Sequence, residues 1–335
     1  MNPDDKRGQS WIAIIRRYNQ PDMRSSIWQI INSLVPYLIL WGLMYYSLEI
    51  SYWITLGLTL FAAGFLVRIF IIFHDCGHGS FFRSSRASRI VGTILGSLAF
   101  TPYDRWHHSH AIHHSTVGNL DKRGDGDIWT MTAEEFRAST PREKWIYRIY
   151  RHPFILFGIG PFLLFVIWFR FNKKGSEKKE RWNTHMTNLI ILIFSSGLIL
   201  LMGWKTFLLI QVPVIFIATA AGAWLFYVQH QFEDVIWTRN DAWDYQKMAL
   251  YGSSFLKVPR ILQWFSGNIG FHHIHHLGPK IPNYNLERCH RENSMFGSVK
   301  PVTLIKGIQT MRFRLWDEEI SRLITFSQLR KAAAN

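Results

Sequence analysis

Four long apolar stretches decide what kind of fold this chain can adopt, because each is long enough to cross a lipid bilayer as a helix. The chain is 48% hydrophobic with a formal charge of +15, and its charged residues gather between the apolar stretches. This segregation predicts an all-α integral membrane protein with four transmembrane helices, and it argues against a soluble enzyme. The stretches cover Trp28–Leu48, Tyr52–Phe73, Met186–Met202 and Thr206–Tyr227.

Basic residues predict which side of the membrane each hairpin end faces. The N-terminal tail is rich in Lys and Arg, whereas the link between the first two stretches carries Glu49 and no basic residue. Since Lys and Arg favour the cytosolic side, the tail is expected in the cytosol and Glu49 outside. The basic run Lys173–Arg181 places the start of the second hairpin in the cytosol in the same way. Both hairpins then return to the cytosol, just before His74 and just before His230.

Two further apolar segments are shorter. Ile90–Phe100 is too short to span a bilayer, so we interpret it as a re-entrant or interfacial segment. Pro153–Phe169 has basic residues on both flanks, so we interpret it as re-entrant or interfacial, with a true span as the alternative.

The chain is expected to be a single membrane domain over residues 1–335, closed on the cytosolic side by a helical cap that carries a histidine-rich two-metal site. No internal repeat and no cleavable signal peptide are expected. The predicted parts are a cytosolic tail (1–27), a first transmembrane hairpin (28–73), a cytosolic or interfacial region (74–185), a second hairpin (186–227) and the cytosolic cap (228–335).

The basic charge and the low cysteine content limit which binding partners and electron carriers are possible. The basic charge suits cytosolic flanks of membrane helices, with anionic lipid headgroups or an acidic protein partner as further interpretations. No nucleic-acid recognition module is evident. The only cysteines, Cys76 and Cys289, cannot form a disulfide framework or ligate a four-cysteine iron–sulfur cluster. Any such electron carrier must therefore be a separate protein.

Most of the fifteen histidines fall into four tight groups. His74 and His78 are spaced i, i+4, and the pattern His-x-x-His-His occurs twice. On a helix such residues share one face, so each pattern can aim three imidazoles at a single point. Imidazole suits iron, zinc, copper and nickel, and the number of candidates suits two ions. The candidate ligands are His74, His78, His110, His113, His114, His230, His272, His275 and His276.

His230 is the least secure of these ligands, and His273 is the alternative to it. A second set of residues is predicted beside the ligands, where acceptors would orient the imidazole rings. Two alternatives remain for this set: one of its carboxylates binds a metal directly, or Asn268 caps a helix. The set comprises Asp75, Asp104, His107, Asn268 and His273.

At these residues the chain resembles the membrane fatty acid desaturases, whose three histidine boxes have the forms HxxxH, HxxHH and HxxHH. Here the boxes are His74–His78, His110–His114 and His272–His276. The resemblance extends from about Ser25 to Trp316 and is closest to the Bacillus-type acyl-lipid (delta-5) desaturases. The flanking segments that carry it are Phe70–Cys76, Asn119–Gly124, Trp224–Asp234 and Gly267–Lys280.

The resemblance implies a multi-pass protein of the bacterial cell membrane whose active site faces the cytosol. It implies two non-haem iron ions (Fe²⁺), with O2 as co-substrate, that introduce a cis double bond into a phospholipid acyl chain at delta-5. Electrons would come from ferredoxin or a flavodoxin-like carrier. The chain lacks the His-Pro-Gly-Gly motif of a fused cytochrome b5 domain, which agrees with an external donor.

Other functions remain as alternatives. An alkyl hydroxylase could use the same histidine boxes, and only its product would distinguish it. A membrane haem electron carrier would place paired histidines inside facing helices. A metal transporter would need polar ligands within the spans, where this chain has almost none.

Overall fold

Four long helices form the membrane part of the protein. In the computed structural model, which describes residues 3–332, they are α2 (Met23–Ser47), α3 (Tyr52–His78), α9 (Lys178–Met202) and α10 (Trp204–His230). All four are long and apolar enough to span a membrane, which confirms the predicted all-α membrane fold. Residues 1–2 and 333–335, the extreme ends of the predicted tail and cap, lie outside the described part.

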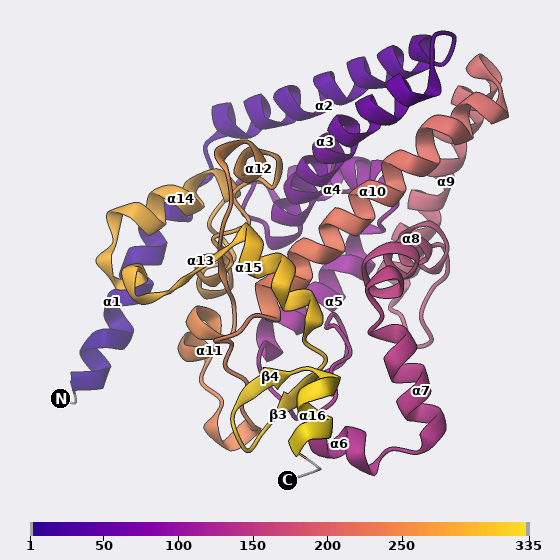
Figure 1. The fold of residues 1–335 in the computed structure, drawn as a ribbon. Helices are drawn as coiled ribbons and strands as arrows, with labels where there is room; N and C mark the ends of the chain where they lie inside the picture. Colours follow the sequence, from indigo (N-terminus) through magenta and orange to yellow (C-terminus); the bar gives the residue numbers. More distant parts are fainter. Residues whose placement is uncertain (1–2, 333–335) are drawn as a thin grey trace.

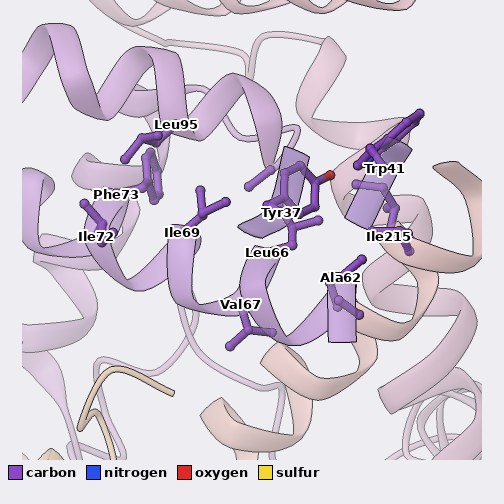
Figure 2. Close-up of a cluster of buried hydrophobic side chains, with 14 of the residues drawn as sticks. Tyr37, Trp41, Ala62, Leu66, Val67, Ile69, Ile72, Phe73, Leu95 and Ile215 are labelled. Atoms are coloured by element: carbon purple, nitrogen blue, oxygen red, sulfur yellow. The ribbon is translucent and has the colours of Figure 1, made fainter. Parts of the chain in front are cut away.

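The four helices run side by side as two hairpins whose turns lie together at one end of the molecule (Figure 1). Helix α3 is central and packs against both α2 and α10. Buried side chains from these helices and from α4 form one apolar cluster, which includes Tyr37, Leu66, Phe73 and Ile215 (Figure 2). This packing fixes the ends of α3 and α10, and both ends carry histidines.

Both histidine-bearing spans continue beyond their apolar stretches. Helix α3 runs through His74 to His78 and ends at Gly79, whose φ of 64° is the left-handed conformation common at helix ends. Helix α10 continues through Tyr227 to His230. The histidines are therefore part of rigid membrane helices and not of the loops that follow them.

The two shorter apolar segments are helical. Ile90–Phe100 lies mostly within α4 (Ser85–Leu98), which packs against α3 and α9. Pro153–Phe169 forms the π-helix η1 (Ile155–Ile159) and α8 (Gly160–Val166), both in contact with α10. Together with α7 (Pro141–Tyr150) this segment is bent by 61°, a geometry that fits a broken span or a re-entrant loop.

The remaining elements surround the histidine-bearing helix ends (Figure 1). The N-terminal tail is largely helical, and its Ile15 and Tyr18 pack into an apolar cluster of the cap. The cap also holds two small two-stranded sheets, which the sequence did not indicate. The elements are α1 (Pro3–Tyr18), α5 (Tyr103–Thr116), α6 (Ala133–Ala138), α11 (Tyr245–Tyr251), β1 (Phe255–Lys257), α12 (Arg260–Phe265), α13 (His272–Leu277), α14 (Asn283–Glu292), β2 (Pro301–Thr303), α15 (Leu304–Gln309), β3 (Leu315–Asp317), β4 (Arg322–Ile324) and α16 (Phe326–Ala332), with short 3₁₀ turns between them.

A close contact sets the position of the second histidine box relative to the first. The Tyr103 hydroxyl, at the start of α5, donates to the carbonyl of Cys76 in α3 at 2.6 Å. The Tyr103 ring lies directly against Gly92 of α4, where a side chain would overlap it. A Cβ at Gly92 would also lie 3.1 Å from the Cβ of Cys76. Gly92 therefore lets three helices meet beside the histidines.

We predict that Gly92→Ala destabilises the protein by about 1–3 kcal/mol, because the held Tyr103 ring cannot move aside. Gly197→Ala is the matched control, since Gly197 lies within α9 and a Cβ there meets no atom within 4 Å. Thermal unfolding of the two detergent-solubilised variants measures the difference. Equal midpoints would contradict the proposed constraint.

Candidate metal centre

Five histidines from three helices meet at the first of two points. His74 and His78 come from α3, His110 and His114 from α5, and His275 from α13. One ring nitrogen from each lies within 4.8 Å of those of the others. All are buried except His78, which is partly exposed.

Four histidines meet at a second, adjacent point. They are His113, His230, His272 and His276, all buried, with ring nitrogens within 4.8 Å of one another. The rings of His114 and His276 stack at 4.0 Å between centroids, so the two groups touch. The structure thus gathers all nine predicted ligands, including His230, into two groups.

Each His-x-x-His-His pattern serves both points, which corrects the expectation that its three rings converge on one. The first and last histidines of each pattern share a group, and the middle one joins the other group. The reason is the 100° turn per residue: position i+4 lies about 40° to one side of i, and i+3 about 60° to the other. His113 and His275 are the two residues that cross over.

The geometry fits metal binding at both points. Neighbouring Nε2 atoms are 3.1 Å apart in the pair His110–His114 and 3.0 Å apart in His230–His272. Nitrogens that bind one metal ion at roughly 2.0–2.1 Å lie about 3.0–3.4 Å apart. The Nε2 of His78 is buried without a hydrogen-bond partner in the described part of the chain. A shared cation would satisfy these converging nitrogens.

Burial also keeps the imidazoles in the form that binds metal. The pKa values of His110, His114, His272, His275 and His276 lie well below the ordinary value, first because burial disfavours the charged ring and then because neighbouring histidines repel it. The rings are therefore neutral at pH 7, with a lone pair available to a metal.

Oxygen atoms hold the second nitrogen of three rings. His74 Nδ1 lies 3.1 Å from an Asp75 carboxylate oxygen, as expected for an orienting acid. His230 Nδ1 lies 3.4 Å from the carbonyl oxygen of Gly252. His113 Nδ1 lies 2.6 Å from a carboxylate oxygen of Asp127. Such contacts fix ring orientation and leave Nε2 pointing at the metal.

Asp127 was not among the residues predicted from sequence. It follows Gly126, which has a φ of 85° and lies so close to α5 that a Cβ there would be 2.6 Å from the carbonyl oxygen of Ser109. Only glycine allows this loop to approach the helix. The available signal was the run Gly124-Asp-Gly-Asp127, which begins ten residues after the second box, because a glycine-rich acidic loop can bring a carboxylate onto a neighbouring helix.

Two other predicted neighbours lie elsewhere. The Asp104 carboxylate accepts from Arg89 at 2.6 Å rather than orienting a histidine. His107 is exposed and stacks on the ring of Tyr103 at 6.2 Å between centroids, and burial of part of its ring lowers its pKa. The ion pair between Asp104 and Arg89 thus joins α5 to α4.

Asn268 and His273 also differ from expectation. The Asn268 side chain accepts from Gln263 and donates to the carbonyl of Asn283, so it joins loops around the third box rather than facing a ligand. His273 is fully buried among aromatic rings, 5.4 Å from His290 and 5.6 Å from Phe255 between centroids. It belongs to neither histidine group, because its side chain is turned about 100° around α13 from that of His272.

Comparison with known proteins agrees with this site. The family model described as fatty acid desaturase matches residues 50–297, which contain all three boxes and His230. The chain belongs to the fatty acid desaturase family. It is therefore a membrane oxidoreductase that desaturates acyl chains, as the resemblance implied.

Relatives of this desaturase come from bacteria and plants. It is 48% identical to a fatty acid desaturase of Bacillus subtilis (strain 168), covering 94% of this chain and 90% of the relative. It is 31% identical to an endoplasmic reticulum omega-3 fatty acid desaturase of Vigna radiata var. radiata, covering 65% and 59%. An sn-1 acyl-lipid omega-3 desaturase (ferredoxin) of Nostoc sp. (strain 36) is 28% identical, covering 65% and 61%.

We predict that Asp127→Asn lowers the metal affinity of the second group by about 10- to 100-fold, because an amide holds His113 less firmly than a carboxylate does. Asp121→Asn is the control, since Asp121 lies on the same loop and pairs with Arg239 at the surface. Metal content after dialysis against a weak chelator measures the effect. Equal metal retention in both variants would show that Asp127 does not support the site.

Proposed function

We propose that this desaturase introduces a cis double bond into a saturated acyl chain of a membrane phospholipid, at the delta-5 position. The reaction uses O2 and two electrons at two non-haem iron ions held by the nine histidines. One observation carries the proposal: two adjacent groups of converging, largely buried imidazoles in a chain of the desaturase family.

The irons, when bound, supply the oxidising chemistry: two hydrogens leave adjacent methylene groups, and O2 with two electrons and two protons becomes two water molecules. The protein's own part is to hold the ligands and exclude water. The ring of Trp106 stacks on His110 at 4.3 Å between centroids, and that of Phe226 lies 5.1 Å from His113. These aromatic side chains shield both groups and make the surroundings suitable for an apolar chain.

The chain works as one domain over residues 1–335 in a bacterial cell membrane, with the histidines facing the cytosol. The absence of basic residues from the Glu49 turn and the basic run Lys173–Arg181 support that orientation. Ferredoxin or a flavodoxin-like protein delivers the electrons, as the printed name of the Nostoc relative suggests for its own donor.

We predict that His275→Ala abolishes double-bond formation, because it removes a ligand of the first group. Expression in a host that lacks unsaturated fatty acids, followed by mass spectrometry of derivatised lipids, reports both the product and its double-bond position. The exposed His185 gives the activity control His185→Ala. Full activity of His275→Ala would contradict the assignment, and a hydroxylated product would identify an alkyl hydroxylase instead.

Metal analysis of the same variants separates ligand loss from loss of a buried ring. His273→Ala removes a fully buried histidine of the same helix that lies outside both groups. We expect it to retain two irons per chain, whereas His275→Ala retains fewer. Equal iron content in the two variants would contradict the ligand set.

We predict that the KM for ferredoxin rises several-fold between about 50 and 300 mM salt, because salt screens attraction between an acidic donor and this basic chain. The kcat at saturating donor should stay nearly constant. A salt-independent KM would contradict electrostatic docking of the donor.

A further inference from the structure

A cavity of about 250 Å³ lies beside the second histidine group, between the segment after α10 and the segment that contains β2 and α15. Its walls include Phe232, Ser253 and Phe313, and its charged lining residues are Glu233, Asp234, Lys300, Lys306 and Arg312. The volume is slightly below the roughly 300–1,000 Å³ of drug-sized ligand sites, which suits a small polar group.

The charges around this cavity are only partly paired. Lys300 lies 3.8 Å from Asp234, which leaves Lys306, Arg312 and Glu233 without an ion-pair partner among the described residues. All three are exposed at the rim. Two free cations beside one free carboxylate match a ligand with a negative and a positive group. A purely anionic ligand would meet the repulsion of Glu233.

A buried polar atom lies in the same cavity. The hydroxyl of Ser253 has no hydrogen-bond partner in the described part of the chain, and the residue is 0% exposed. A buried hydroxyl that lacks a partner is unfavourable, because it has given up its hydrogen bonds to water. A ligand oxygen in the cavity would remove that cost.

The position of α15 places the cavity at the depth of lipid headgroups. Gly307 of α15 packs so closely on α10 that an added Cβ would lie 3.0 Å from Val228 and 3.1 Å from Trp224. About 20 helical residues cross the hydrocarbon core, so a helix that begins at Trp204 reaches its boundary near Trp224. Figure 1 shows α15 beside this end of α10.

The outer face of α15 is apolar, as expected for a helix at this boundary. Ile305 is 69% exposed and Ile308 is 55% exposed, and residues three apart share one helix face. Exposed isoleucines beside the rim cation Lys306 are typical of segments that insert shallowly into a bilayer. This apolar face suits a cavity that opens at the depth of the headgroups.

The cavity is also next to the reaction site. Ser253 directly follows Gly252, whose carbonyl oxygen lies 3.4 Å from His230 Nδ1. Phe232 lies two residues beyond His230 and forms part of the wall. A headgroup bound in the cavity would place the first carbons of its acyl chain beside the second histidine group.

From these observations we propose that the cavity binds the zwitterionic headgroup of the phospholipid substrate, with its phosphate on Lys306 and Arg312 and its ammonium on Glu233. The proposal rests on the proposed function, because it assumes an acyl chain esterified in phospholipid. Arg and Lys donate charge-assisted hydrogen bonds to phosphate oxygens. The headgroup thereby fixes how far the acyl chain extends past the metals.

Binding of soluble short-chain lipids to the purified protein, measured by isothermal titration calorimetry without turnover, tests the site. Dihexanoyl phosphatidylethanolamine should bind at least about tenfold more weakly to the double variant Lys306→Glu/Arg312→Glu than to the wild type. The control Lys247→Glu reverses an exposed charge on α11 and should bind like the wild type. Unchanged binding by the double variant at an unchanged unfolding midpoint would overturn the proposal.

Two further binding measurements test whether the bound phosphate belongs to a lipid and whether Glu233 binds the ammonium group. Inorganic phosphate should compete poorly, and equal affinity for it would identify a free-anion site and overturn the lipid assignment. Glu233→Gln should weaken binding of the ethanolamine lipid but not of dihexanoyl phosphatidylglycerol, which has no ammonium. Equal effects on both lipids would overturn the zwitterion pairing.

Lipid analysis distinguishes this proposal from the proposed function. If the wild type forms no double bond but binds the ethanolamine lipid through Lys306 and Arg312, the function fails and the site stands. If double bonds form in vivo at the same rate and position in the double variant, the function stands and the headgroup site fails.

Discussion

The structure depends on bringing nine imidazoles from four separate stretches of chain to two adjacent points. Each ring gives up water on burial, and converging lone pairs repel unless a cation lies between them. Helices α3 and α10 supply ligands from their final turns, so their length and rotation are constrained by the site. A shift of one residue would turn His74 or His230 by about 100°. The membrane hairpins therefore serve as a rigid frame for the metal centre.

Polar contacts between distant segments keep that frame in register. Asp75, beside the first ligand, accepts at 2.7 Å and 2.9 Å from the backbone and side-chain amides of Asn283 after the third box. Asn283 in turn accepts from Gln29 of α2 at 2.8 Å. The buried Arg151 donates to Gln231, next to His230, and to the carbonyl of Phe313 in the cap. A single carboxylate and a single guanidinium thus connect the first hairpin, the second hairpin and the cap.

Local patterns predicted the four spans and the nine histidines that cluster, because apolar length and the spacing of histidines are properties of short segments. The ends of α3 and α10 were predicted too early, since a polar residue such as His78 lies beyond the apolar stretch yet continues the helix. Asp127, the Asp75–Asn283 contact and the burial of His273 could not be predicted, because each depends on segments that meet only in the fold. For Asp104 the competing partner, Arg89, lies on a neighbouring helix and outweighed the nearby histidines.

The division of histidines between the two groups follows from helix geometry and couples the two candidate metal sites. Helix α5 gives His110 and His114 to the first group and His113 to the second, whereas α13 gives His272 and His276 to the second and His275 to the first. Each helix therefore supports both points, and the exchange is reciprocal. Displacing either helix would disturb both groups together, so the separation of the two groups is set by two short helices packed across the stacked rings of His114 and His276. A reaction that needs two metals at one fixed separation is well served by ligands shared in this way.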